Sequence, residues 1–550
     1  MKLDFYKQKN SILLIIFYLT ALILAFANLQ DFGIHIEEKF HRLNGHYWLN
    51  YIAKQFGFVD LQKITEIKIN SISDYSLSSV SYYNKYGVVL DLPIALIEVL
   101  FDLENTTNIY YLKHLLGFII FLISSLFFFR ILSRRFDNFY INFFGLFLYV
   151  SSPRILGDSF LYKDVLFLSF FTISVFFFLE CINKISLKNL LYFSLFNALA
   201  LNLRIVAIFL PIFFLLVLII KNFYINIFFK NYKKLIIYFL SLVFFVFIFW
   251  PYLWEDPFSK VIELFSSLKT DLIYVKILYF NKYIPNAFLP SSYIINWIFI
   301  SSPIFQIIFF SIGYIIYTIR FYGRFLRIKN KSIYNDLWRS RKEEKDFIFF
   351  LFLTSFFFIF IFSNLRLYNG WRLVYFLNIF ILYFGIYFLD LSFKYFRKNL
   401  LVKNCIKLMI FVSVFYNSYA IFSYHPFQSL YFNSFLSEKI KNSFEGDYHG
   451  ISAKHFFQKI SKIDERNVIK IAVASHTPLH RGLEGISPNL KKRFEIVGQE
   501  YHSADYVYKN NISEVNSVLN KKYEVPENFS KIYELKINKV KIYEIYKFNG

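Results

Sequence analysis

SILLIIFYLTALILAFANL, residues 11–29, is the stretch that decides the fold. It carries no charge and is long enough to cross roughly 30 Å of hydrocarbon as a helix. Directly after it stands Asp31-Phe-Gly-Ile-His-Ile-Glu37-Glu38. Three carboxylates and a histidine therefore follow at the point where a membrane helix should emerge into water. Acidic residues clustered at the end of a membrane helix, in so apolar a chain, indicate chemistry at a membrane surface.

The rest of the chain has the composition of a membrane protein. Hydrophobic residues make up 56% of its 550 residues, and the mean hydropathy is +0.43, values far above those of a soluble globular chain. The apolar residues recur in runs of about 17 to 25, the length of a membrane helix. Open strands are excluded because lipid offers no partner to free backbone groups. We therefore predict an α-helical polytopic protein.

We expect about eleven transmembrane helices. Val88 to Phe101 is apolar but contains Asp91, Pro93 and Glu98, which indicates an interfacial or re-entrant helix. The predicted spans are 11–29, 110–132, 138–152, 164–182, 189–203, 205–221, 235–252, 291–317, 347–363, 372–391 and 404–424.

Charge predicts the orientation. The connection 318–346 has nine Lys and Arg against four Asp and Glu, whereas the first long loop, 31–104, has six against ten. Basic loops stay in the cytoplasm, so the N-terminus is predicted inside and the first loop outside. Ala25-Phe26-Ala27 also resembles a signal-peptide cleavage site, and with or without cleavage the following segment starts outside. An odd number of spans places the end of the chain outside as well.

The last part of the chain has a different pattern. Residues 468–474 and 504–509 look like buried strands, and residues 451–463 have helical spacing. Two alternating segments flank Asn538-Lys539, as in a β-hairpin. We expect a membrane domain over residues 1–435, with a large first outside loop over 30–109, and a soluble α/β domain outside the membrane over 436–550.

The net charge of +23 would indicate nucleic acid in a soluble protein. Here it is better explained by basic cytoplasmic loops and a Lys-rich tail, so we expect the bilayer, and no nucleic acid, as a partner. Cys181 and Cys405 both lie near predicted cytoplasmic helix ends, and no disulfide is predicted.

Polar residues collect at the outside ends of the predicted helices. The spans are nearly free of charge, which argues against an ion path through the bilayer. Arginine matches phosphate geometry with two parallel donors, and a carboxylate can take a proton from an attacking hydroxyl. This combination suits a reaction on a lipid phosphate. The candidates are Asp31, Glu37, Glu38 and Asp164 as acids, and Arg154, Lys163, Arg204, Arg366 and Arg372 as substrate-binding cations.

Several of these residues have simpler explanations. Glu37 and Glu38 are also compatible with a solvated turn, and Asp164 with a helix N-cap. Arg366 and Arg372 are also compatible with interface anchors. The histidines of the first loop are more typical of an unliganded polar loop than of a metal site, and we predict no metal.

The same segments resemble the polytopic GT-C glycosyltransferases, particularly bacterial relatives of protein O-mannosyltransferases and the lipid A aminoarabinose transferase. The resemblance covers residues 1–435. Its motifs are Glu37-Glu38, the Ser-Pro segment that ends in Lys163-Asp164, Leu203-Arg204, Pro251-Tyr-Leu-Trp254-Glu, Pro290-Ser-Ser-Tyr293, Tyr368-Asn-Gly-Trp-Arg372, and His425-Pro-Phe-Gln428 with Tyr431-Phe-Asn433.

This resemblance implies a sugar donor carried on polyprenyl phosphate, an unknown acceptor, a first-loop acid as catalytic base and inversion at the anomeric carbon. It also implies a bacterial cytoplasmic membrane. We predict no cofactor, with a divalent metal as the open alternative. Asp164 matches the second-loop acid of the family, and Arg204 and Arg372 match basic positions near the donor phosphate. The family usually has Asp first in the acidic pair, so Glu37 leaves Glu37, Glu38 and Asp31 all open as the base.

Two other functions compete with glycosyl transfer. A transporter or flippase of lipid-linked saccharides should show broken helices or ionisable groups near the midplane and repeat symmetry. A non-catalytic scaffold should act through its external tail.

Overall fold

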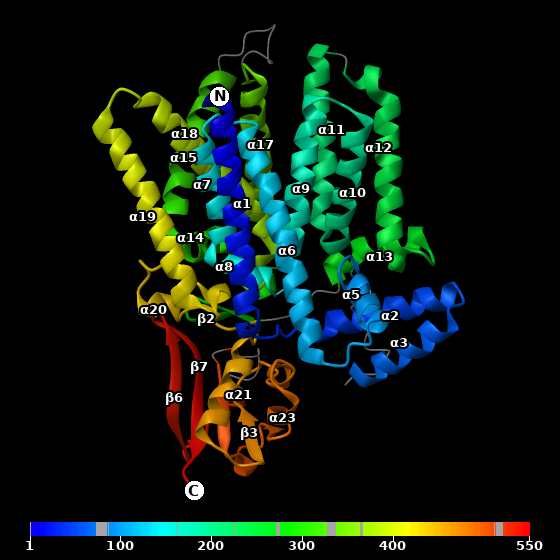
Figure 1. The fold of residues 1–550 in the computed structure, drawn as a ribbon, viewed down its shortest axis with the longest axis vertical. Helices are drawn as coiled ribbons and strands as arrows, with labels where there is room; N and C mark the ends of the chain where they lie inside the picture. The colour runs from blue at the N-terminus through cyan, green and yellow to red at the C-terminus, as the bar shows by residue number, and fades with distance from the viewer. Residues whose placement is uncertain are drawn as a thin grey trace.

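The computed structural model describes residues 2–72, 85, 87–161, 163–225, 227–270, 276–326, 337–363, 367–510, 512 and 521–550. A bundle of long helices stands above a smaller domain that holds a sheet (Figure 1). The N-terminus lies at the far end of the bundle, and the C-terminus lies beyond the sheet. The predicted fold class, an α-helical polytopic membrane protein with a small C-terminal α/β domain, is confirmed.

Every predicted span contains helix. The bundle consists of α1 (Lys2–Asn28), α6 (Thr106–Ser133), α7 (Phe139–Ser151), α8 (Pro153–Ser159), α9 (Asp164–Asn183), α10 (Leu187–Leu203), α11 (Phe209–Ile225), α12 (Ile227–Phe249), α14 (Tyr293–Ser301), α15 (Ile304–Phe325), α17 (Arg341–Phe362), α18 (Asn378–Tyr395) and α19 (Leu400–Tyr424).

The predicted count of eleven spans is not confirmed. By length and composition, eight helices of the described residues can cross a membrane, or nine if α7 and α8, which meet at a bend of 60°, form one span. Three of the predicted spans are missing from the count of eight. They correspond to α7, α10 and α11, which are only 13, 17 and 17 residues long. The predicted span 291–317 is broken into α14 and α15, because Pro303 cannot continue the helix that ends at Ser301.

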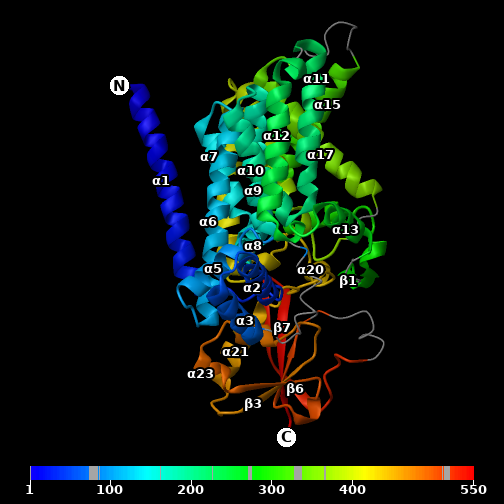
Figure 2. The same cartoon turned by 90° about the vertical axis from the view of Figure 1, so that its right-hand side faces the viewer.

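Burial separates the centre of the bundle from its edge. In α9 and in the span Arg372–Tyr395, which contains α18, 89% of the residues in the apolar 18-residue stretch are buried. In α1, only 6% of the corresponding residues are buried. Figure 2 shows α1 standing at the margin of the bundle. Phenylalanine rings fill the centre, where Phe171, Phe376 and Phe380 are fully buried. The centre of the Phe171 ring lies 4.9 Å from that of Phe376 and 6.3 Å from that of Phe380.

The loop after α1 folds into helices at the end of the bundle that faces the sheet domain. They are α2 (Glu38–Gln55), α3 (Val59–Ile72) and α5 (Asp91–Leu100), and α13 (Pro257–Thr270) lies at the same end (Figure 1). α5 matches the non-spanning helix predicted over residues 88–101. α2 and α5 approach closely at Gly45, where a Cβ would collide with the Asp91 carbonyl.

The C-terminal domain is a five-stranded mixed sheet in the order β4-β3-β5-β7-β6. Its strands are β3 (Ile469–Val473), β4 (Phe494–Gly498), β5 (Tyr506–Lys509), β6 (Phe529–Ile537) and β7 (Val540–Phe548), with α21 (Ser452–Ile463) packed against them. β3 is parallel to β4 and β5, and β7 is antiparallel to β5 and β6. Asn538 and Lys539 have positive φ, as a tight hairpin turn requires, so the predicted hairpin is confirmed.

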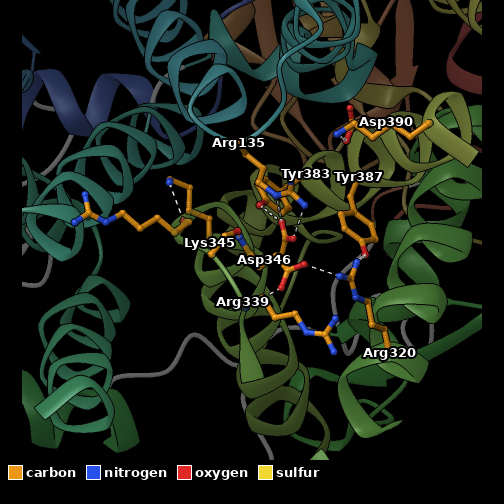
Figure 3. Close-up of polar contacts among 12 residues, drawn as sticks. Arg135, Arg320, Arg339, Lys345, Asp346, Tyr383, Tyr387 and Asp390 are labelled. Atoms are coloured by element: carbon orange, nitrogen blue, oxygen red, sulfur yellow. Dashed lines mark hydrogen bonds and ion pairs between the residues drawn. The ribbon is translucent and has the colours of Figure 1, made fainter. Parts of the chain in front are cut away.

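A buried ion pair joins helices at the opposite end of the bundle, near the N-terminus (Figure 3). Arg135, just after α6, donates two hydrogen bonds of 2.7 Å to the Asp346 carboxylate on α17. Tyr383 Oη of α18 donates to the same carboxylate at 2.5 Å. Asp346 is 1% exposed, so this contact ties three helices together away from water.

Asp346→Asn should strongly destabilise the protein. The change leaves the Arg135 guanidinium buried without its counter-charge, a loss of about 3–5 kcal/mol in the free energy of unfolding. The matched control is Asp137→Asn, which breaks the pair with Lys342 at the surface and should lower stability by about 1 kcal/mol at most. Unfolding in mixed micelles measures both. Equal losses in the two variants would contradict the structural role given to Asp346.

Candidate active site

A small polar pocket opens at the end of the bundle next to the sheet domain. Its walls come from four segments that lie far apart in the sequence: the loop after α1, the turn between α8 and α9, the start of the Arg372–Tyr395 span, and the segment before α21. The lining residues are His35, Glu37, Glu38, His41, Asp158, Leu161, Lys163, Asp164, Arg372 and His449.

The two neighbouring glutamates have different environments. The Glu37 side chain is 36% exposed, and its Oε1 accepts a hydrogen bond of 2.9 Å from Arg372 Nη2. Glu38 is 1% exposed; both of its oxygens accept from His114 Nε2, at 3.0 and 2.9 Å, and Oε1 also accepts from the His35 backbone N–H. Glu37 is therefore open to a ligand, whereas Glu38 is held by protein partners.

Arg372 is the centre of the pocket's charge. It contacts Glu37 through Nη2 and Asp164 Oδ2 through Nη1, the latter at 3.4 Å. The guanidinium lies between the rings of Tyr368 and Tyr448, 5.4 and 5.7 Å from their centres. Such a buried, planar donor set is suited to a phosphate.

Local backbone geometry places Arg372. Asn369 and Gly370 both have positive φ, of 54° and 74°, and such residues are favoured in tight turns because Asn and Gly tolerate the left-handed region. The Gly370 N–H donates to Tyr293 Oη at 3.1 Å. The turn therefore places Arg372 in the pocket, at the beginning of the span Arg372–Tyr395.

Asp164 and its neighbour Lys163 open α9. Asp164 also pairs with Arg204, which ends α10, so its carboxylate lies between two guanidiniums. Lys163 has a φ of 27°, which is unfavourable for a residue with a Cβ. Backbone strain of this kind is common at functional sites. Two cations, Lys163 and Arg372, thus line the pocket, and a third, Arg204, is joined to it through Asp164.

Burial and charge set the protonation states. Burial raises the pKa of Glu37, but Arg372, His35 and Lys163 outweigh it and hold the pKa well below its usual value. Burial lowers the pKa of Lys163 to about 8, with help from the Arg204 charge and against Glu37 and Asp164. Burial also lowers the pKa of His35 to about 4 and that of His449 well below its ordinary value. At neutral pH the pocket therefore holds an ionised Glu37, a mostly charged Lys163 and two neutral imidazoles.

Some predicted site residues lie elsewhere. Asp31 is outside the pocket, with its side chain 53% exposed and paired with His425 Nε2 at 2.8 Å. Arg154 donates to the Tyr431 carbonyl at 3.1 Å and lies over the rings of Trp297 and Phe432. The prediction for Arg366 falls outside the described residues.

The pocket also contains residues that were not predicted as site residues. His35, His41 and Asp158 stand within the loops that the sequence marked as polar, so they were visible but could not be ranked. His449 had no such signal, because it belongs to the segment that leads into the C-terminal domain. Among the described residues, no group of three or more His, Cys, Asp and Glu is placed to hold a metal ion.

Comparisons with known proteins add one structural similarity. No protein-family model and no curated protein sequence matches the chain. Among solved structures, the chain is similar to the apo form of the oligosaccharyltransferase of Archaeoglobus fulgidus, with 9% identity and a TM-score of 0.35 over 78% of this chain. The chain spans 62% of the length of that enzyme.

Proposed function

We propose that this protein is an inverting membrane glycosyltransferase of the GT-C type, which moves a sugar from a polyprenyl-phosphate donor to an acceptor hydroxyl. The observation that carries the proposal is the position of Arg372, which touches both Glu37 and Asp164 in a pocket at the end of an apolar bundle. A solvent-accessible carboxylate beside a cationic phosphate site is what an attack on a sugar phosphate requires.

The reaction follows from these positions. Glu37 takes the proton of the acceptor hydroxyl, whose oxygen attacks the anomeric carbon. The bond between that carbon and the phosphate oxygen breaks, and the polyprenyl phosphate leaves with the electron pair. Arg372, Arg204 and Lys163 stabilise its charge. When the donor phosphate binds the Arg372 guanidinium, it replaces Glu37 as the partner of that charge. Glu37 then loses its strongest counter-charge, so the pKa of its carboxyl rises in the complex.

An apolar groove beside the pocket supports a lipid-linked donor. It has a volume of about 410 Å³ and lies between α1, α6, α7, α8 and α19. Phe160 lines the groove, and the next residue, Leu161, lines the pocket. A hydrocarbon chain in the groove would leave its phosphate end near the cations.

The distribution of charge supports a location. Following the positive-inside rule, the Arg135–Asp346 end faces the cytoplasm and the pocket opens on the outer side of a bacterial cytoplasmic membrane. Residues 1–435 form the membrane domain, and residues 436–550 lie outside.

Lipid analysis tests the proposal. Protein is purified in mild detergent, and its bound lipids are extracted and identified by mass spectrometry. We expect polyprenyl phosphate or its glycosylated form to be retained. Retention of bulk phospholipid alone, after incubation with excess polyprenyl phosphate, would contradict the proposed donor.

The pH dependence should depend on Lys163. Because its pKa is about 8, the amine is charged below that pH and loses its charge above it. We expect kcat/KM for a polyprenyl-phosphate sugar to fall above about pH 8, since kcat/KM reports the free enzyme. Lys163→Arg keeps the charge and should remove the alkaline limb. An unchanged limb in Lys163→Arg would assign it to another group.

A further inference from the structure

A segment of the C-terminal region forms one wall of the pocket. His449 lies within it, and the His449 carbonyl accepts a hydrogen bond of 3.0 Å from the Ile36 backbone N–H. The Asp447 carboxylate accepts from the backbone N–H groups of Ile451 and Ser452 at 3.1 and 2.8 Å. The segment is thus fixed on one side to the loop that carries Glu37, and on the other to the start of α21.

The fit between this segment and the first loop is close. A Cβ at Gly33 would collide with the Ile451 carbonyl. Gly450 has a φ of 70°, and a Cβ there would lie within 2.8 Å of Ile36 Cγ2. Since neither position admits a larger residue without rearrangement, the backbone next to His449 is packed closely against the first loop.

The His449 side chain lies opposite Asp158. His449 Nε2 lies 3.9 Å from Asp158 Oδ1, beyond hydrogen-bonding distance. The two side chains are 11% and 6% exposed. Among the described residues, His449 Nδ1 and Asp158 Oδ1 have no hydrogen-bond partner, whereas Asp158 Oδ2 accepts from Tyr375 Oη at 2.5 Å.

His449 and Asp158 both line the pocket, so a ligand bound there can partner their two buried polar atoms. Each such atom costs about 1–3 kcal/mol when left unsatisfied. A neutral imidazole presents one donor and one acceptor. Burial raises the pKa of Asp158 to about 7, so its carboxyl presents only acceptors in the ionised form and also donates in the protonated form. A hydroxyl both donates and accepts, so a pair of hydroxyls satisfies this combination.

We propose that Asp158 and His449 form a subsite for sugar hydroxyls, in which Asp158 Oδ1 accepts from one hydroxyl and the His449 imidazole binds its neighbour. This inference rests on the proposed function and adds a part for the C-terminal region: it supplies a sugar-binding residue to a pocket that is otherwise built by the membrane domain. The subsite binds either the donor sugar or the acceptor sugar, which share this chemistry.

Binding measurements separate the sugar from the phosphate. Wild-type protein in nanodiscs is titrated with bare polyprenyl phosphate and with polyprenyl-phosphate glucose, mannose and galactose; a second arm uses the methyl glycosides of the same sugars. The variants are His449→Phe, which keeps the ring shape without its nitrogens, and Asp158→Asn. The matched control is His455→Phe, which removes another imidazole of the C-terminal region, bonded to Tyr543 Oη.

We expect at least one sugar-bearing lipid to bind the wild type about tenfold more tightly than the bare lipid, the effect of one or two hydrogen bonds to a charged or buried group. His449→Phe and Asp158→Asn should erase that preference and leave the affinity for bare lipid within about twofold. His455→Phe should keep it.

The two arms of the experiment show whether the subsite binds the donor sugar or the acceptor sugar. If the variants keep the donor preference but lose binding of a methyl glycoside, the subsite serves the acceptor. If they keep both, or if the wild type binds no sugar in either arm, the subsite is refuted. Failure of the wild type to bind polyprenyl phosphate would instead contradict the proposed donor, while the glycoside arm would still test the subsite.

Discussion

Glu37→Gln is expected to lower kcat about 10²–10⁴-fold, the usual contribution of a positioned general base. The substitution keeps the size of the side chain and its hydrogen bond from Arg372 Nη2, but an amide cannot take a proton from the acceptor. KM for the donor should change little, because the phosphate cations remain. Steady-state transfer from a polyprenyl-phosphate sugar, in purified protein, measures both constants.

The neighbouring acids provide the controls. Asp31→Asn should retain activity within about threefold, since Asp31 is exposed and paired with His425. Glu38→Gln disturbs the buried contacts with His114 and the His35 backbone, so it should lower thermal stability as well as kcat. A larger loss of kcat in Asp31→Asn than in Glu37→Gln, with folding intact in both, would move the base to Asp31.

Arg372→Met should lower kcat/KM about 10²–10³-fold, the effect of removing one preorganised charge donor. Arg372 is the group that joins Glu37 to Asp164, and it is held between two tyrosine rings. Arg372→Lys should recover part of the loss, because a lysine keeps the charge but cannot present two parallel donors. Kinetics of the three proteins at saturating acceptor give the comparison.

Arg324→Met controls for loss of a partly buried arginine. Arg324 pairs with Glu343 at the opposite end of the bundle, so its removal should leave kcat/KM within about twofold after correction for folded protein. If Arg372→Met shows no greater loss than Arg324→Met, Arg372 has no part in binding the donor.

The helices were predictable because their signal is local. An apolar run of 17 to 25 residues predicts a membrane helix, and each predicted span contains helix. The number of membrane spans was harder to predict, because residues 139–151 and 187–225 form short helices whose lengths depend on where the chain turns. The alternating segments around Asn538-Lys539 gave the hairpin for the same local reason.

The pocket was predictable only in outline. The predicted topology puts Glu37, Asp164, Arg204 and Arg372 on one side of the membrane, and the structure places them within one connected set of contacts. The sequence could not choose among Asp31, Glu37 and Glu38, because the choice depends on partners such as His425 and His114. These partners come from other segments of the chain.

His449 illustrates the limit most clearly. Nothing in Asp447-Tyr-His-Gly450 distinguishes it from an ordinary loop. Its place beside His35 follows from close contacts at Gly33 and Gly450, which only the folded chain reveals.

The most direct test of glycosyl transfer follows the fate of the donor lipid. Purified protein is reconstituted in liposomes with a polyprenyl-phosphate sugar and a mixed pool of hydroxyl acceptors, and the lipid is analysed by mass spectrometry over time. The account predicts that polyprenyl phosphate accumulates with wild-type protein as the sugar moves to an acceptor, and that Glu37→Gln stops this. A donor that crosses the bilayer with its sugar still attached, at equal rates in both proteins, would contradict the account and indicate a flippase.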